Sequence, residues 1–151
     1  MHLNKVQDKI IEEFEIIIDQ VKNRFRYFRH VANLGLLLPS IASIERTNEK
    51  LIKLTRSKIW LDAEYRDGKV YYSGDSDSWV MKGILQLYLR VFSGRRPNEI
   101  VDSNIYFANE IELHSFLSPD RRSEIASVLQ RMRALAAGFK LKSLDSPAQA
   151  G

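Results

Sequence analysis

The stretch of this chain with the most side chains that could do chemistry is residues 74–78, which reads Gly-Asp-Ser-Asp-Ser. Carboxylates and hydroxyls at this density could serve a catalytic or binding role. The other interpretation is helix capping, because an apolar helical pattern follows as far as Phe92. Asp75, Ser76 and Asp77 can each offer an oxygen to free N–H groups of the first turn. On the residues alone we favour capping.

The remaining candidate side chains do not assemble into a site. His2, His30 and His114 lie far apart, with no carboxylate or histidine at ligand spacing, so we expect no metal. The 7 glycines are scattered singly and form neither a phosphate-binding loop nor a nucleophile elbow. The sequence contains no cysteine, which excludes disulfides, thiolate ligands and cysteine nucleophiles within it. We expect no cofactor.

Composition indicates one globular domain. A chain of 151 residues with 44% hydrophobic residues can build one core and is too short for two domains of ordinary size. A net charge of +4 permits an acidic partner, but a small excess of this kind usually marks a solvated surface. No run is long enough for a membrane span, and residues 1–5 lack the apolar core of a secretory signal, so we expect a cytoplasmic protein.

The first third of the chain has helical periodicity. Asn4 and Gln7 have capping-box spacing, and apolar residues then recur at three- and four-residue intervals until Gly35 and Pro39. The pattern fits one long helix, or two with a break near residues 19–23.

Basic residues lie between aromatics in the second part of this stretch, namely Arg24, Arg26, Arg29 and His30. They could form a nucleic-acid surface. A core-facing helix with a solvated back gives the same pattern, so we do not expect nucleic-acid binding.

The period then changes to that of a strand. Residues 39–50 read as an ordered connector, and apolar residues alternate with polar ones from Ile59 to Tyr65. Asp-Gly at positions 67–68 predicts a tight hairpin turn into a return strand. Trp60 and Trp79 are interpreted as packing residues.

Helices fill the rest. Gly94 is a predicted left-handed cap, Pro97 begins a short helix, and residues 105–117 hold another short helical stretch. Ser118 precedes Pro119 at the start of a closing helix. Strands bracketed by helices predict an α+β fold, a small antiparallel sheet covered on one face, with residues 1–142 as the domain and 143–151 as a tail that frays.

Several separated motifs resemble those of the SufE family. Residues 74–84 read Gly-Asp-Ser-Asp-Ser-Trp-Val-Met-Lys-Gly-Ile, against the family's Gly-Asp-Ser-Asp-Ala followed by Val-Lys-Gly. Residues 93–100 match Ser-Gly-x-x-Pro-x-Glu-Ile, residues 117–121 match Leu-Ser-Pro-Ser-Arg, and residues 59–61 match Val-Trp-Leu. The resemblance covers roughly residues 50–139 in the right order, which makes it specific. It implies a SufE/IscU-like fold.

The resemblance also implies a partner and an activity. SufE-type proteins act in iron-sulfur cluster assembly, where a SufS-like cysteine desulfurase that uses pyridoxal phosphate passes persulfide sulfur to their own cysteine. The family cysteine lies in a loop that reads Gly-Cys-Gln-Ser-Gln-Val-Trp. Counting back from Trp60, Thr55 occupies the cysteine position in this sequence.

The replacement removes the family's chemistry. A threonine hydroxyl is far harder to ionise than a thiol and cannot hold a persulfide. Neighbours depart from the family pattern too: Leu54, Arg56 and Lys58 in the loop, Phe116 before Leu-Ser-Pro, and residues 123–124. We therefore interpret the chain as a pseudo-sulfur-acceptor and not an enzyme.

Asp77 and Arg121 match family residues that lie near the cysteine loop, although a structural role is the simpler interpretation for each. Two hypotheses follow. In the first, the chain docks on a cysteine desulfurase as a non-transferring modulator or decoy, or as an activator that closes the partner's active site. In the second, the fold is repurposed to bind another, acidic partner through a basic loop of Lys53, Arg56 and Lys58. The predicted partner-binding residues are Thr55, Arg56, Lys58, Asp75, Asp77 and Arg121.

Overall fold

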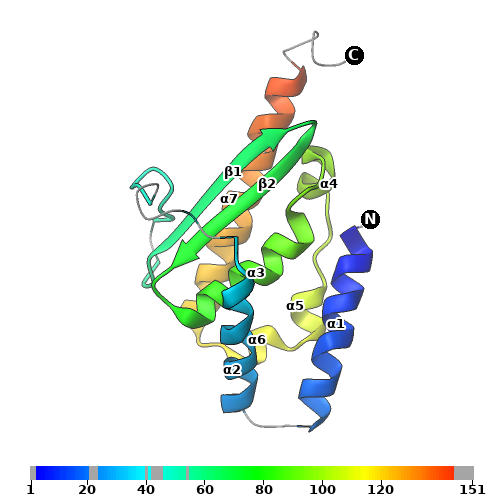
Figure 1. Ribbon diagram of the computed structural model, residues 1–151, viewed down its shortest axis with the longest axis vertical. Coiled ribbons are helices and arrows are strands. Elements are labelled where there is room, and N and C mark those ends of the chain that lie inside the picture. Colours follow the sequence, from blue (N-terminus) through cyan, green and yellow to red (C-terminus); the bar gives the residue numbers. More distant parts are fainter. Residues whose placement is uncertain (1–2, 21–23, 40, 42–45, 54, 145–151) are drawn as a thin grey trace.

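The computed structural model, shown in Figure 1, describes residues 3–20, 24–39, 41, 46–53 and 55–144. Helices pack against one β-hairpin, so the predicted α+β class is confirmed. The N-terminal periodicity forms two helices, although the break between them lies outside the described residues. The elements in order are α1 (Leu3–Gln20), α2 (Arg24–Leu34), the short 3₁₀ helix η1 (Gly35–Leu37), β1 (Ile59–Arg66), β2 (Lys69–Ser76), α3 (Trp79–Phe92), α4 (Pro97–Val101), α5 (Phe107–Glu110), α6 (Leu113–Phe116) and α7 (Pro119–Leu144).

The hairpin forms as the sequence predicts. Strands β1 and β2 pair antiparallel along their full length, with Ile59 opposite Ser76 and Arg66 opposite Lys69. Asp67 and Gly68 have φ values of 53° and 77°, which matches the right-handed twist of the flanking strands. Helix α7 passes behind the hairpin in Figure 1 and contacts β1, and α3 runs alongside β2 and contacts it. The sheet therefore has a covered face and an open face.

Helix α3 is the centre of the core, and the sequence prediction for it needs two corrections. Its N-cap is Ser78, whose hydroxyl accepts a hydrogen bond from the backbone N–H of Met81 at 3.3 Å, so Asp75, Ser76 and Asp77 do not cap it. Apolar burial is also not confined to one face, because α1, α2 and β2 all contact α3. Its buried residues are Met81, Gly83, Ile84, Leu85, Gln86, Leu87, Tyr88, Leu89, Val91 and Phe92.

Helices α2 and α3 approach each other closely at Gly83. A Cβ atom at this position would lie 1.7 Å from the carbonyl oxygen of Val31 on α2, a distance that no side chain tolerates. The missing side chain lets the two helix backbones approach until Val31 is itself fully buried. Gly83 therefore sets how α2 sits on α3.

Other predictions at element ends have mixed outcomes. Gly94 has a φ of 80° after α3, and Pro97 is the first residue of α4, as expected. The single helical stretch expected at 105–117 is wrong, because Glu112 at a φ of 57° separates α5 from α6. Trp79 is 60% exposed and is not a packing residue. Trp60, half-buried, lies under the guanidinium of Arg46, 5.4 Å from the ring centre.

The expected capping box at the N-terminus is also wrong. Asn4 lies inside α1, which begins at Leu3. Gln7 is fully buried and its Oε1 accepts hydrogen bonds from the backbone N–H groups of Tyr106 and Phe107, at 2.9 and 3.2 Å. The Gln7 side chain therefore links α1 to the start of α5 through hydrogen bonds.

The C-terminal helix runs slightly further than the sequence indicates. Helix α7 continues to Leu144, two positions past the predicted domain end, while residues 145–151 lie outside the described part of the chain. The hydroxyl of Tyr72 on β2 donates to the carbonyl of Met132 on α7 at 2.7 Å, and burial raises the pKa of this tyrosine well above its ordinary value. Among the described helices, none is both long and apolar enough to cross a bilayer.

We predict opposite effects for two glycine-to-alanine changes in helices. Gly83→Ala should lower the free energy of unfolding by more than about 3 kcal/mol, because the new methyl group overlaps the Val31 carbonyl. Gly138→Ala on α7 meets nothing within 4 Å and should raise the free energy of unfolding by about 0.5–1 kcal/mol. Urea titration followed by circular dichroism measures both, and a neutral Gly83→Ala would contradict the packing described.

Candidate functional site

A polar hollow of about 480 Å³ lies where the loop before β1, the turn after β2 and the start of α7 meet. The N-terminal ends of α3 and α7 lie at the same end of the molecule in Figure 1. Hydroxyls and charged groups dominate the lining, which consists of Arg56, Ser57, Asp77, Ser78, Ser118, Asp120, Arg121 and Glu124. We call this surface the loop hollow.

The loop that borders the hollow is held from α7. The Arg121 guanidinium donates to the hydroxyl of Ser57 at 2.7 Å, and the backbone N–H of Ser57 donates to a carboxylate oxygen of Glu124 at 3.3 Å. Both Ser57 and Glu124 are buried. The first turn of α7 thus fixes the middle of the loop.

The turn after β2 holds the next residue of the loop. The backbone N–H of Lys58 donates to the Asp77 carboxylate at 2.9 Å, and the backbone N–H of Asp77 donates to the Lys58 carbonyl at 3.1 Å. The Ser76 hydroxyl donates to the same carbonyl at 2.8 Å. Asp77 therefore anchors the loop and does not cap a helix, which corrects the structural role expected for it.

Thr55 lies just outside the lining of the loop hollow. Its hydroxyl lies 2.7 Å from the carbonyl oxygen of Ser57 and 3.3 Å from that of Ile52, so its single proton is directed at backbone acceptors. These contacts close the loop on itself. Thr55 acts here as a brace within the loop.

The charges around the hollow differ in how strongly they are constrained. Arg121 and Glu124 approach to 3.5 Å, and the Glu124 side chain is only 4% exposed. The second carboxylate oxygen of Glu124 has no hydrogen-bond partner among the described residues. Arg56 and Asp120 pair at 3.3 Å, but their side chains are 84% and 60% exposed, so this pair contributes little to stability.

Asp75 does not belong to the loop hollow. Its carboxylate pairs with Arg46 at 2.9 Å and with Lys82 at 3.6 Å, and it is absent from the lining. Lys82 also lies over the exposed ring of Trp79, 4.5 Å from its centre. Of the predicted partner-binding residues, Arg56, Asp77 and Arg121 line the hollow, Thr55 and Lys58 lie in the bordering loop, and Asp75 is separate.

Glu124, the most buried of the three side chains that hold the loop, has a role that was not predicted from the sequence. Glu124 was noted only as a departure from the family pattern, Ser118 only as the cap of the closing helix, and Ser57 and Asp120 were given no role. A signal was present, because Glu124 lies three residues after Arg121 and one before the buried Ile125, on the inward side of α7. A carboxylate at that position needs a buried partner.

The arrangement offers binding groups and lacks the usual groups for covalent or metal chemistry. Within the described ranges, no cluster of His, Asp or Glu side chains is suited to a metal ion. The serine hydroxyls have no histidine beside them in the lining to act as a base. Exposed cations and anions around a fixed loop instead make a surface that a partner could recognise.

Known proteins share this architecture and sequence pattern. The family model SufE, described as an Fe-S metabolism associated domain, matches residues 8–136. An uncharacterized SufE-like protein of Rhizobium meliloti is 32% identical over 139 residues, covering 87% of this chain and 94% of that protein. One from Synechocystis is 33% identical over 133 residues, covering 88% and 81%.

A solved structure has a similar fold. The solution structure of a hypothetical protein from Thermus thermophilus superposes with a TM-score of 0.68 over 88% of this chain and 94% of that one. The identity is 15%, so this similarity concerns the fold alone.

We predict that the Arg121 and Glu124 side chains are energetically coupled. Arg121→Met should lower the free energy of unfolding by about 2 kcal/mol, because it leaves the Glu124 carboxylate buried without its cation. Adding Glu124→Gln should recover part of that loss, since a neutral amide oxygen can still accept from Ser57. Arg122→Met on the exposed side of α7 is the matched control and should change little. Additive effects in the cycle would show that the pair is not coupled.

Proposed function

This chain belongs to the SufE family of Fe-S metabolism associated domains, and we propose that it docks on a cysteine desulfurase as a modulator that does not accept sulfur. The partner class comes from the family, whose members generally interact with such enzymes. The loop hollow is the proposed docking surface, because the loop that aligns with the family's cysteine loop borders it and because Asp77 and Arg121, which match family residues near that loop, line it. The docking residues are Thr55, Arg56, Lys58, Asp77 and Arg121.

The observation that carries the proposal is the absence of any thiol in the sequence. Accepting sulfur from a persulfide requires a thiolate that attacks it and then holds the transferred sulfur. Thr55 stands at the proposed acceptor position, and its hydroxyl is directed at backbone carbonyls within the loop. The side chain at that position is therefore both chemically unsuited to the transfer and turned inward.

Docking can persist without transfer because residues 57–58 of the loop are already held in place. The backbone N–H groups of Ser57 and Lys58 donate to the Glu124 and Asp77 carboxylates. Arg121 donates to the Ser57 hydroxyl, so a partner would not have to order these two residues on binding. Arg56 and Lys58 remain exposed on the outside of the loop and can meet carboxylates of a partner. The ordered backbone and outward charges are what a preformed docking surface requires.

Docking could change the partner's sulfide release in either of two directions. A decoy would occupy the desulfurase and lower sulfide release by competing with a thiol-bearing acceptor. An activator would raise sulfide release by closing the partner's active site, without taking sulfur itself. Comparing sulfide release with and without this chain separates the two.

A second candidate is that the same surface binds a different, acidic partner. The exposure of Lys53, Arg56 and Lys58 along one loop favours it. The Arg56 and Asp120 pair weakens it, because part of the positive charge is already neutralised. The desulfurase proposal is preferred because this loop aligns with the family's cysteine loop, and members of the family interact with such enzymes.

We predict that Thr55→Cys gives this chain the ability to accept sulfur. Incubation with a desulfurase from the same source and free cysteine should add the mass of one sulfur atom to Thr55→Cys and none to the wild type or to Thr55→Ser. Thr55→Ser is the matched control, because it keeps a small hydroxyl and adds no thiol. A desulfurase that binds neither the wild type nor Thr55→Cys would remove this chain from the sulfur pathway.

We predict that reversing one exposed charge weakens docking in a salt-dependent way. Arg56→Glu should reduce desulfurase affinity about tenfold at low ionic strength, and the difference should shrink as salt screens the contact. Lys69→Glu, the same reversal at the exposed tip of the hairpin, is the control and should leave affinity unchanged. Isothermal titration at two salt concentrations measures this. Tight binding of an unrelated acidic protein, with none to the desulfurase, would favour the second candidate.

A further inference from the structure

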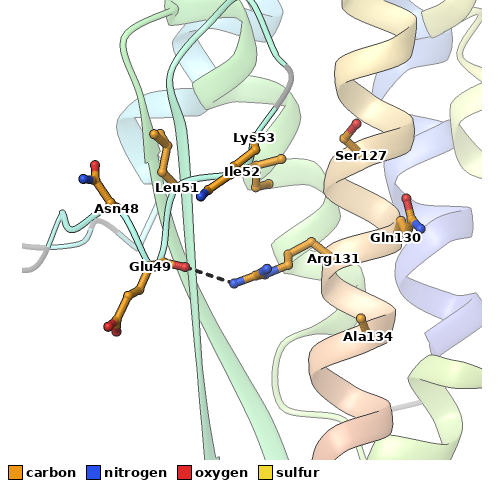
Figure 2. Close-up of a pocket in the computed structure, with 9 residues that line it drawn as sticks. All are labelled: Asn48, Glu49, Leu51, Ile52, Lys53, Ser127, Gln130, Arg131 and Ala134. Carbon is orange, nitrogen blue, oxygen red and sulfur yellow. Dashed lines mark hydrogen bonds between the residues drawn. The ribbon is translucent and has the colours of Figure 1, made fainter.

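A second and larger hollow, of about 770 Å³, separates residues 48–53 from α7. Figure 2 shows residues 48–53 on one side and the helix on the other, with Arg131 extending across the space toward the backbone of Glu49. Leu51, Ile52 and Ala134 contribute to a mostly apolar lining. We call it the α7 groove, and it shares no lining residue with the loop hollow.

One wall of the α7 groove is an unfinished sheet edge. The backbone N–H of Ile52 donates to the carbonyl of Ile59 at 2.8 Å, and the N–H of Leu61 donates to the carbonyl of Lys50 at 2.9 Å. Leu51 thus lies opposite Trp60 as a short third strand beside β1. Because neighbouring residues of a strand direct their backbone groups to opposite edges, the N–H and C=O of Leu51 point away from β1. Within the described chain, neither group has a hydrogen-bond partner.

The groove also carries uncompensated positive charge. Arg131 donates to the carbonyl oxygen of Glu49 at 3.1 Å, while its Nε is shielded from solvent and unpartnered among the described residues. Neither Arg131 nor Lys53 pairs with a carboxylate in the part of the chain that the structure describes. The Glu49 carboxylate points away from the groove in Figure 2. A partly desolvated cation without a counter-ion favours the approach of an anion.

We propose that the α7 groove binds an extended acidic peptide segment of a partner protein, which pairs with Leu51 as an added strand. Main-chain hydrogen bonds to Leu51 would give affinity, an apolar side chain of the segment would cover Ile52 and Ala134, and a carboxylate would meet Arg131 and Lys53. A small apolar molecule would use the lining but leave the Leu51 edge unpaired. The peptide is the occupant that satisfies the edge, the apolar lining and the charge together.

The test begins with a selection that needs no knowledge of the partner. A phage-displayed library of random dodecapeptides is selected on the full-length chain and counter-selected on Ala134→Trp. Ala134 is exposed at the rim, so an indole there fills the groove without entering the core. The expected result is enrichment of sequences that combine alternating apolar residues with Asp or Glu. Failure of any sequence to survive counter-selection would overturn the proposal.

A synthetic copy of the enriched peptide then tests each feature. Its affinity, measured by fluorescence anisotropy, should fall at least about tenfold for Ala134→Trp and for Arg131→Met. It should be unchanged for Ala126→Trp, an exposed alanine on α7 outside the groove, which controls for the added indole.

Strand pairing is tested on the peptide, which leaves the protein intact. Methylating alternate backbone nitrogens of the peptide in one register should abolish binding, while methylating the other set should not, since a paired strand directs only every second residue toward its neighbour. Equal binding of both methylated forms would overturn strand addition. Arg56→Glu should leave peptide affinity unchanged, so this proposal can fail or hold separately from desulfurase docking.

Discussion

The approach of α2 to α3 at Gly83 is the contact on which the rest of this structure depends. Because the Val31 carbonyl occupies the place of a side chain, α3 can be buried by helices on one side and by the hairpin on the other. A helix enclosed in this way has little freedom to shift or rotate. Its first turn, with Ser78 as N-cap, is therefore a fixed reference point for the polar residues that precede it.

The loop before β1 is held by groups that are far apart in sequence. Asp77 belongs to the turn into α3, whereas Arg121 and Glu124 belong to the first turns of α7, and all three bind the backbone or side chain of residues 57–58. The ends of two helices packed in one core thus act as a rigid clamp on a short loop. The side chains of Arg56 and Lys58 are exposed and do not take part in these hydrogen bonds. The side chains that fix the loop are therefore different from the basic side chains that a partner would contact.

Local physics explains which features could be predicted from the sequence. The hairpin was predictable because strand alternation and an Asp-Gly turn are short-range signals, and the start of α7 was predictable because Ser118 and Pro119 each favour one position. The N-cap of α3 was misplaced because several consecutive residues have side chains able to cap, and only the chain path selects Ser78. The membership of the site was partly wrong for a related reason. Asp75 is drawn away by Arg46, 29 residues earlier, and no local pattern encodes that pairing.

A loop built around cysteine has several chemical states, since a thiol can be free, persulfidated, oxidised or bonded to another thiol. The Thr55 hydroxyl in this loop has none of these thiol states and bonds to backbone carbonyls. Because the 151 residues contain no cysteine, oxidants and reductants do not change the charge or shape of this face through thiol chemistry. The binding properties of this face therefore do not depend on the oxidation state of a thiol within it.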